Sequence, residues 1–158
     1  MSTKTIITDV KIITPLEVIN KGNILINGAV IEDVCSTTTA FFSKDTKIID
    51  GSGLIACPGF IDLHVHGAKG LNFASNTDKA SLTEILRYHF SHGTTSLLAT
   101  LISGTDQDIQ KNLRNIIDNA NSLSPTIFNN RQWTDNKPEE NESEENESEI
   151  LGFHLEGP

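Results

Sequence analysis

The chain has 158 residues, of which 37% are hydrophobic and 21% are charged, and its formal net charge is -9 at pH 7. This length and composition are typical of a soluble globular protein with one sizeable core. No apolar run approaches the roughly 20 residues of a membrane-spanning helix, and no secretory signal follows the amino terminus. We therefore expect a cytoplasmic protein without a membrane partner.

The negative charge is concentrated in one segment. Residues 131–149 contain seven Glu and one Asp against one Arg and one Lys, a net charge of -6 that leaves -3 for the rest of the chain. The pentapeptide Glu-Asn-Glu-Ser-Glu occurs at 140–144 and again at 145–149. Such polar sequence buries too little apolar surface to offset the entropy of ordering it, so we predict an acidic, disordered insertion over 129–149. No basic surface is evident, and no nucleic-acid partner is expected.

Residues 1–57 have the pattern of a small all-β unit, which we expect to be sandwich-like. Short β-branched runs alternate with turn signals. The strand candidates are residues 5–8, 10–14, 24–26, 30–31, 47–50 and 54–57. Asn27-Gly28 lies between two of these runs and predicts a two-residue hairpin turn, since both turn positions favour positive φ.

After Pro58-Gly59 the pattern changes to strands that alternate with helices. The predicted elements are a strand at 60–65, a helix at 78–92, a buried strand at 94–102, a helix that Thr105 or Asp106 caps and Pro125 closes, and a strand at 150–155. Strands and helices in this order favour βαβ units and a parallel sheet.

Two histidines lie at the end of the first of these strands. Side chains alternate along a strand, so Asp62, His64 and His66 are predicted on one face and the apolar residues between them on the other. Imidazoles two residues apart can both reach one cation. The same pattern also fits a pair of solvent-facing or hydrogen-bonded histidines.

The last strand repeats this arrangement with Gly152, His154 and Glu156 on one face. An ionised carboxylate at the end of an apolar strand is costly to bury unless it is paired or bound to a cation. The alternative is a cap on a following helix. In a parallel barrel both strands would present their ends at the same face, so His64, His66 and Glu156 are predicted to form a metal site.

Three motifs carry a resemblance to a known family: Pro-Gly-Phe-Ile-Asp-Leu-His-Val-His-Gly at 58–67, Gly-Thr-Thr-Ser at 93–96 and Gly-Phe-His-Leu-Glu-Gly-Pro at 152–158. Together they resemble the amidohydrolase superfamily. The first motif is shared by many of its members. His-Leu-Glu-Gly-Pro after the Gly-Thr-Thr-Ser strand resembles specifically the N-acetylglucosamine-6-phosphate deacetylase family. The resemblance covers nearly the whole chain apart from 129–149.

The resemblance implies an α/β fold, the start of a TIM-like (β/α)8 barrel preceded by the small all-β unit. A complete barrel takes about 250 residues, whereas residues 58–158 would supply about three strands and two helices, so we expect an incomplete barrel. Glu156 matches the family's metal-binding glutamate, and His64 and His66 match a pair that some members use for a second metal. The implied cofactor is one or two divalent ions, zinc or a similar metal.

The activity implied by the resemblance is hydrolysis of an N-acetyl group, which converts an amino-sugar phosphate substrate into glucosamine 6-phosphate and acetate. The family's catalytic aspartate, further histidine ligands and phosphate contacts would lie beyond Pro158. We therefore expect no catalytic residue within this chain, no activity of this chain alone, and poor autonomous stability. A family-like homo-oligomer would also need the missing region.

Two other interpretations stay open. One is a non-catalytic, truncated amidohydrolase-like protein with at most residual metal binding through His64, His66 and Glu156. The other is a different amidohydrolase, such as a dihydroorotase-like or amino-acid-deacylating enzyme. The His-Leu-Glu-Gly-Pro strand favours the sugar deacetylase over this last interpretation.

Overall fold

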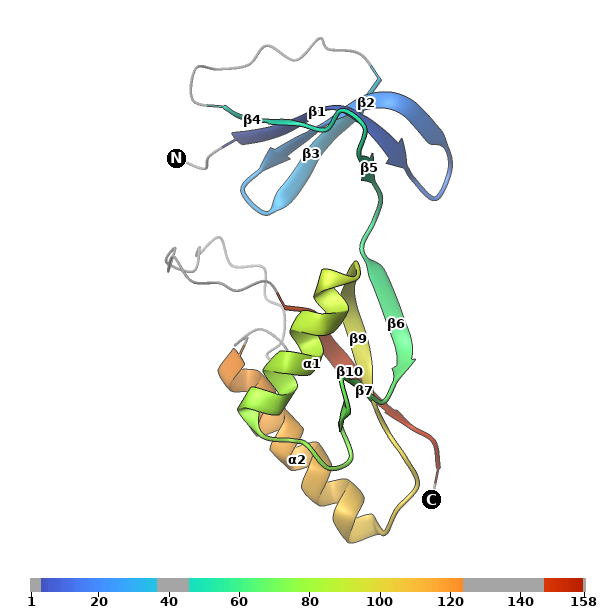
Figure 1. Ribbon diagram of the computed structural model, residues 1–158, viewed down its shortest axis with the longest axis vertical. Coiled ribbons are helices and arrows are strands. Elements are labelled where there is room, and N and C mark those ends of the chain that lie inside the picture. Colours follow the sequence, from blue (N-terminus) through green and yellow to red (C-terminus); the bar gives the residue numbers. More distant parts are fainter. Residues whose placement is uncertain (1–3, 37–45, 124–146, 158) are drawn as a thin grey trace. The chain divides into compact units, whose positions relative to one another are not determined.

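The computed structural model describes residues 4–36, 46–123 and 147–157, with the side chains of 121–123 left out (Figure 1). The chain divides into two compact units, Met1–Pro58 and Gly59–Pro158. Most of the predicted insertion at 129–149 lies outside the described residues. In the described ranges, neither helix combines the length and the apolarity that crossing a membrane requires.

The first unit is a five-stranded sheet. Its strands are β1 (Lys4–Ile13), β2 (Val18–Asn27), β3 (Val30–Cys35), β4 (Lys47–Asp50) and β5 (Ile55–Ala56). The order is β3-β2-β1-β4; β1, β2 and β3 form an antiparallel ladder, while β4 and β5 both pair with β1 in parallel. Its core cluster contains Val10, Ile12 and Ile24. The described residues of this unit form a single sheet, whereas a sandwich consists of two sheets packed face to face.

The first strand is longer than the sequence predicts. Residues 5–8 and 10–14 were expected as separate strands, but a single β1 runs through both. The ladder shifts register between Ile7 and Val10, and Asp9 in this gap has a φ of 59°. Aspartate tolerates this left-handed conformation better than most residues, and its N–H donates to Oδ1 of Asn23 at 3.3 Å. A bulge therefore replaces the predicted break.

The predicted hairpin between β2 and β3 is confirmed, with its turn one position later. Asn27 pairs with Val30, so the two turn residues are Gly28 and Ala29. Of these two, only Gly28 has a positive φ, 60°. A glycine with positive φ at the first turn position is what a type II′ turn requires.

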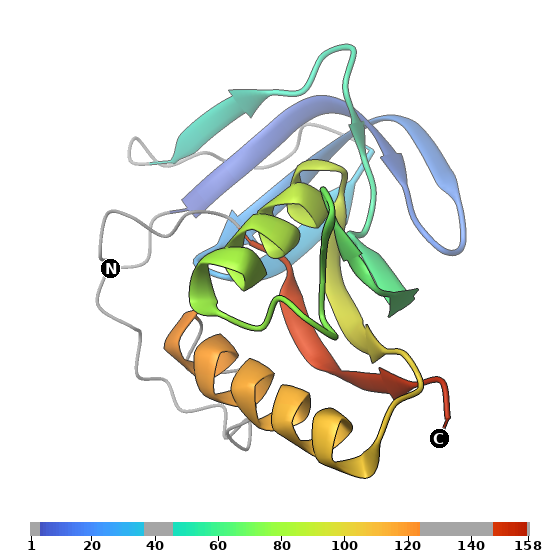
Figure 2. The same cartoon turned by 60° about the horizontal axis from the view of Figure 1, so that its bottom comes forward.

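The second unit is a parallel sheet with two helices. Its elements are β6 (Phe60–Val65), β7 (Gly67–Ala68), β8 (Leu71–Asn72), α1 (Lys79–Ser91), β9 (Thr94–Leu101), α2 (Asp106–Leu123) and β10 (Glu149–Leu155). The sheet order is β10-β9-β6 with both pairs parallel, which confirms the predicted parallel strands. Figures 1 and 2 show both helices on one face of this sheet. The short β7–β8 hairpin was not predicted.

Local signals start and end the helices as expected. Asp78 caps α1 by accepting a hydrogen bond from the N–H of Ser81 at 3.0 Å, and Gly93, with a φ of 90°, follows the end of the helix. At α2, the N–H of Asp108 donates to the hydroxyl of Thr105 at 3.2 Å. Thr105 is therefore the cap rather than Asp106.

The core of this unit lies between the sheet and the helices. Alternate residues of the middle strand, Leu97, Ala99 and Leu101, are at most 2% exposed. They belong to one cluster with the helix residues Leu82, Ile85, Leu86, Ile116 and Ala120 and with Val65, Phe73 and Ile150. Because side chains alternate along β9, Ser96, Leu98 and Thr100 face the side of the sheet away from the helices.

A bulge in β10 decides which residues face that other side. Ile150 pairs with Leu97 but Gly152 pairs with Leu98, so Leu151 is an extra residue without a counterpart. Both Ile150 and Phe153 consequently contact the helix-covered core. The alternation predicted for this strand holds from Gly152 onward and breaks at Leu151, since an inserted residue reverses the faces.

The prediction of a disordered insertion up to residue 149 is wrong at its end. Ser148 is 3% exposed, its N–H donates to the carbonyl of Leu86 at 3.3 Å, and its hydroxyl donates to the carbonyl of Thr94. Glu147 pairs with Arg87 at 3.1 Å, and Glu149 begins β10. The sequence does not reveal where order begins, because Glu147 and Ser148, which make these contacts, belong to the same polar repeat as the residues before them.

Candidate metal centre

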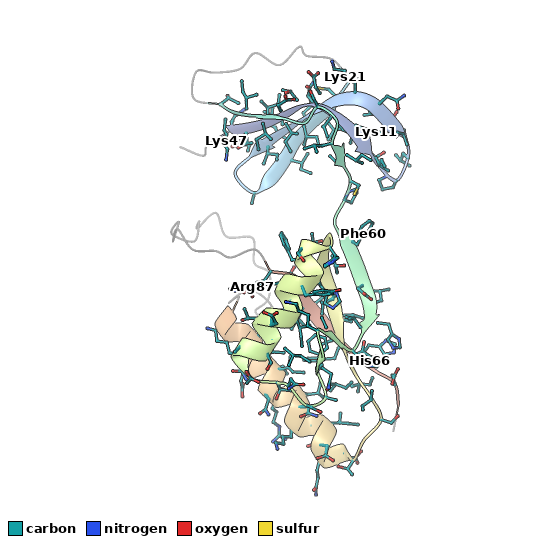
Figure 3. All side chains as sticks on the ribbon, viewed as in Figure 1. Lys11, Lys21, Lys47, Phe60, His66 and Arg87 are labelled. Atoms are coloured by element: carbon teal, nitrogen blue, oxygen red, sulfur yellow. The ribbon has the colours of Figure 1, made fainter. Side chains whose placement is uncertain are left out.

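Three ionisable side chains converge at the carboxyl ends of β6 and β10. Nε2 of His64 lies 3.2 Å from Nε2 of His66. Oε1 of Glu156 lies 3.1 Å from Nε2 of His64 and 3.2 Å from Nε2 of His66. Figure 3 labels His66 at the end of β6. The structure thus brings together all three residues that the sequence predicts as metal ligands.

The sheet topology explains this convergence. β6 and β10 are the two neighbours of β9, and both run parallel to it. Parallel neighbours end at the same edge of a sheet, so residues far apart in sequence meet there. The register places Val65 beside Ala99 and Leu155 beside Leu101, and the N–H of Glu156 donates to the carbonyl of Leu101 at 3.2 Å. The strand ends are therefore fixed by backbone pairing.

The geometry of the three atoms fits a divalent cation. Zinc binds histidine nitrogen at about 2.0–2.1 Å in tetrahedral geometry, which separates neighbouring ligand atoms by about 3.3 Å. The three observed separations, 3.1–3.2 Å, are close to this value. The side chains are 49%, 43% and 34% exposed for His64, His66 and Glu156, so a cation has access from solvent. Two imidazoles and one carboxylate also form a donor set that zinc and similar metals accept.

A cation would also resolve the crowding of lone pairs. When both imidazoles are neutral and present Nε2 as an acceptor, three lone-pair atoms face one another across about 3 Å, which is electrostatically unfavourable without a positive charge between them. Nδ1 of His66 is buried and has no hydrogen-bond partner within the described part of the chain. Ligating histidines normally donate this second N–H to an outer partner, and none of the described residues supplies one to His66.

Other residues near the site have different roles from those the strand pattern suggests. Asp62, predicted on the face of the two histidines, accepts a hydrogen bond from the N–H of His64 at 3.0 Å. His154 packs its ring against that of His64, with centroids 4.6 Å apart. Neither Asp62 nor His154 contributes a ligand atom to the group formed by the other three residues.

The chain leaves His66 through the tight β7–β8 hairpin. Gly67 has a φ of 151°, and a Cβ at this position would lie 2.1 Å from the carbonyl oxygen of Leu71. Only glycine fits there. In the hairpin turn, Lys69 forms an ion pair with Glu84 of α1, and its ammonium lowers the pKa of that carboxyl group. The turn is thereby tied to the helix.

A parallel α/β sheet that presents two histidines and a glutamate at the ends of the two strands flanking β9 has the arrangement expected from the resemblance to amidohydrolases. No family model matches the chain. The chain is similar, along its whole length, to the amino-terminal portion of N-acetylglucosamine-6-phosphate deacetylases. The one from Bacillus subtilis is 33% identical over 161 residues, a match that spans 100% of this chain and 35% of that protein. The one from Caenorhabditis elegans is 31% identical over 140 residues, spanning 84% of this chain and 27% of that protein.

The solved structures agree on the fold. The crystal structure of N-acetylglucosamine-6-phosphate deacetylase from Pasteurella multocida matches 98% of this chain with a TM-score of 0.71 at 20% identity, and the match covers 34% of that chain. The chain thus spans 27–35% of the length of these proteins.

Proposed function

We propose that this chain supplies metal ligands to an N-acetylglucosamine-6-phosphate deacetylase, through His64, His66 and Glu156. The observation that carries the proposal is the convergence of Nε2, Nε2 and Oε1 within 3.1–3.2 Å of one another at two strand ends. The likeness of the whole chain to deacetylases of this name supports the choice of substrate, an N-acetylated amino-sugar phosphate.

When it is bound, a divalent ion such as zinc or a similar metal polarises an amide carbonyl and lowers the pKa of bound water. The two imidazoles of this chain would donate neutral lone pairs, and Glu156 would contribute the negative charge of the set. The side chains of His64, His66 and Glu156 are partly exposed, which leaves room for a substrate amide at the carboxyl ends of β6 and β10. One or two ions are compatible with this proposal.

We further propose that β6, β9 and β10 are the first strands of a TIM-like barrel within a unit at 58–158, preceded by the β unit at 1–57. The exposed apolar residues of the outer strands support this. Ile61 and Leu63 of β6 are 59% and 61% exposed, and Leu155 of β10 is 50% exposed. Further barrel strands would cover such positions, since exposed strand edges and apolar surface favour association. A cytoplasmic location is part of the same proposal.

The test is an activity assay on the natural polypeptide that contains this segment. We expect it to release acetate from N-acetylglucosamine 6-phosphate. Glu156→Gln should lower the rate by roughly 100-fold or more, because even outer-shell partners of metal ligands contribute 10–100-fold. Asp118→Asn, which removes an exposed carboxylate of α2 in the same unit, is the matched control and should change the rate little.

Three outcomes would contradict the proposal. Release of product from dihydroorotate or from an N-acyl amino acid in preference to the sugar would indicate a different amidohydrolase. Metal binding without hydrolysis of any of these substrates would indicate a non-catalytic protein. An unchanged rate in Glu156→Gln would remove this residue from the ligand set.

A further inference from the structure

The backbone around the two histidines is held by side chains. The N–H of His64 donates to Oδ1 of Asp62 at 3.0 Å, and the N–H of Val65 donates to the hydroxyl of Thr100 at 2.9 Å. The β6–β9 pairing shifts register between Asp62 and Val65, which is the stretch that contains His64. A register shift removes regular ladder partners from backbone groups, and those groups need other partners.

Thr100 is placed to replace a ladder partner. It lies in the middle strand, is fully buried at 0% exposure, and its hydroxyl also donates to the carbonyl of Leu98 at 3.3 Å. The hydroxyl therefore accepts one hydrogen bond and donates another, which fixes its orientation. A buried hydroxyl is unfavourable unless it is hydrogen-bonded, and the bonds to Val65 and Leu98 meet this need.

The two side-chain contacts differ in strength. The bond from Val65 to Thr100 is buried, whereas the bond from His64 to Asp62 is exposed to water. Hydrogen bonds in a low-dielectric interior are electrostatically stronger than those in water. Val65 links His64 to His66, and a shift of its backbone would move both imidazoles. The Thr100 contact is therefore a buried side-chain bond to the backbone between the two histidines.

We propose that Thr100 is a positioning residue for the metal site: its hydroxyl holds the N–H of Val65 and thereby keeps Nε2 of His64 and Nε2 of His66 directed at one cation. This inference rests on the proposed metal site. It assigns a function to a buried threonine that follows Leu97, Leu98 and Ala99 in β9.

Two substitutions separate the hydroxyl from the packing of this residue. Thr100→Val keeps the branched shape but removes the acceptor, whereas Thr100→Ser keeps the hydroxyl and removes a methyl group. Thr95→Val is the matched control, because Thr95 is an exposed threonine of the same strand. Cobalt(II) is titrated into each full chain and followed by its visible absorption. Hydrogen exchange of the Val65 amide is measured in the metal-free chain.

We expect Thr100→Val to lower the cobalt affinity by about 10–100-fold, the range typical of outer-shell partners, and to speed exchange of the Val65 amide. Thr100→Ser and Thr95→Val should keep both properties near those of the unsubstituted chain. If Thr100→Ser loses affinity and Thr100→Val keeps it, packing is responsible and the inference is wrong.

The two proposals fail in different ways. An unsubstituted chain that binds no cobalt contradicts the proposed metal site itself. An unsubstituted chain that binds cobalt, together with a Thr100→Val chain of equal affinity, contradicts only the positioning role. A Thr100→Val chain that loses affinity without any change in Val65 exchange also overturns the role, because the effect would then not pass through that N–H.

Discussion

The two units of this chain use β-strands in different ways. In Met1–Pro58 the central strands are antiparallel, and the core is a small cluster of Val10, Ile12 and Ile24. In Gly59–Pro158 the main sheet is parallel, two helices cover one face, and the core cluster contains 11 buried residues. Antiparallel neighbours place opposite ends side by side, whereas parallel neighbours bring carboxyl ends together. Among the described residues, the histidine and glutamate ligand atoms accordingly gather in the second unit.

The difference in core size predicts the largest effect. Ile116→Ala, at a fully buried position of the second unit, should lower the free energy of unfolding by about 2–5 kcal/mol, because it leaves a cavity between the helices and the sheet. Ile12→Ala, 4% exposed in the small core, should cost less because its surroundings collapse more easily. Urea denaturation, combined with hydrogen exchange followed separately in each unit, measures the free energy of unfolding of the two units. A larger loss from Ile12→Ala would contradict the comparison.

The hairpin after His66 predicts a smaller effect within the second unit. Gly67→Ala should destabilise the fold by more than about 1 kcal/mol, because the new Cβ would overlap the backbone of Leu71. Gly70→Ala is the control, since Gly70 has a φ of 82° but open space around it and carries conformational strain alone. Thermal unfolding of both variants tests this. Equal losses would show that the close approach at Gly67 does not matter.

The cap of α1 predicts the smallest effect and a pH dependence. Hydrogen bonds from the side chain and the N–H of Ser81 hold the pKa of Asp78 below its ordinary 3.8. A carboxyl group whose pKa is lowered by folding stabilises the protein above its unfolded pKa, and this contribution is lost as the pH falls through the folded pKa. Asp78→Ala should therefore lower the melting temperature slightly at neutral pH and have no effect in strong acid.

The control for this prediction is Asp118→Ala, an exposed aspartate within α2. It should leave the pH dependence of the melting temperature as it is in the unsubstituted chain. An equal effect of Asp78→Ala at neutral pH and in strong acid would mean that the carboxylate does not act as a charged cap.

Local sequence signals predicted much of the fold. The strands at 47–50 and 60–65 have the predicted bounds, and the first helix begins after Asp78 and ends before Gly93. These elements depend on periodicity and capping, which neighbouring residues determine. Bulges at Asp9 and Leu151 were not predicted because they depend on which residues of another strand lie opposite.

In the candidate site, too, features that depend on neighbouring residues were predicted and features that depend on strand pairing were not. His64, His66 and Glu156 were predicted because alternation along a strand and a shared strand end follow from the sequence motif. The contact of Thr100 with Val65 was not, because it exists only where β6 shifts register against β9. The contact between the tilted rings of His154 and His64 likewise depends on the spacing between β10 and β6 across the middle strand.

The central claim is that His64, His66 and Glu156 bind one divalent cation, and a cobalt titration of the unsubstituted chain beside Glu156→Gln and Asp118→Asn tests it most directly. We predict a saturable visible absorption with one dominant site in the unsubstituted chain and in Asp118→Asn, and a large loss of affinity in Glu156→Gln. Equal affinity in all three chains, or no binding to the unsubstituted chain, would contradict the claim.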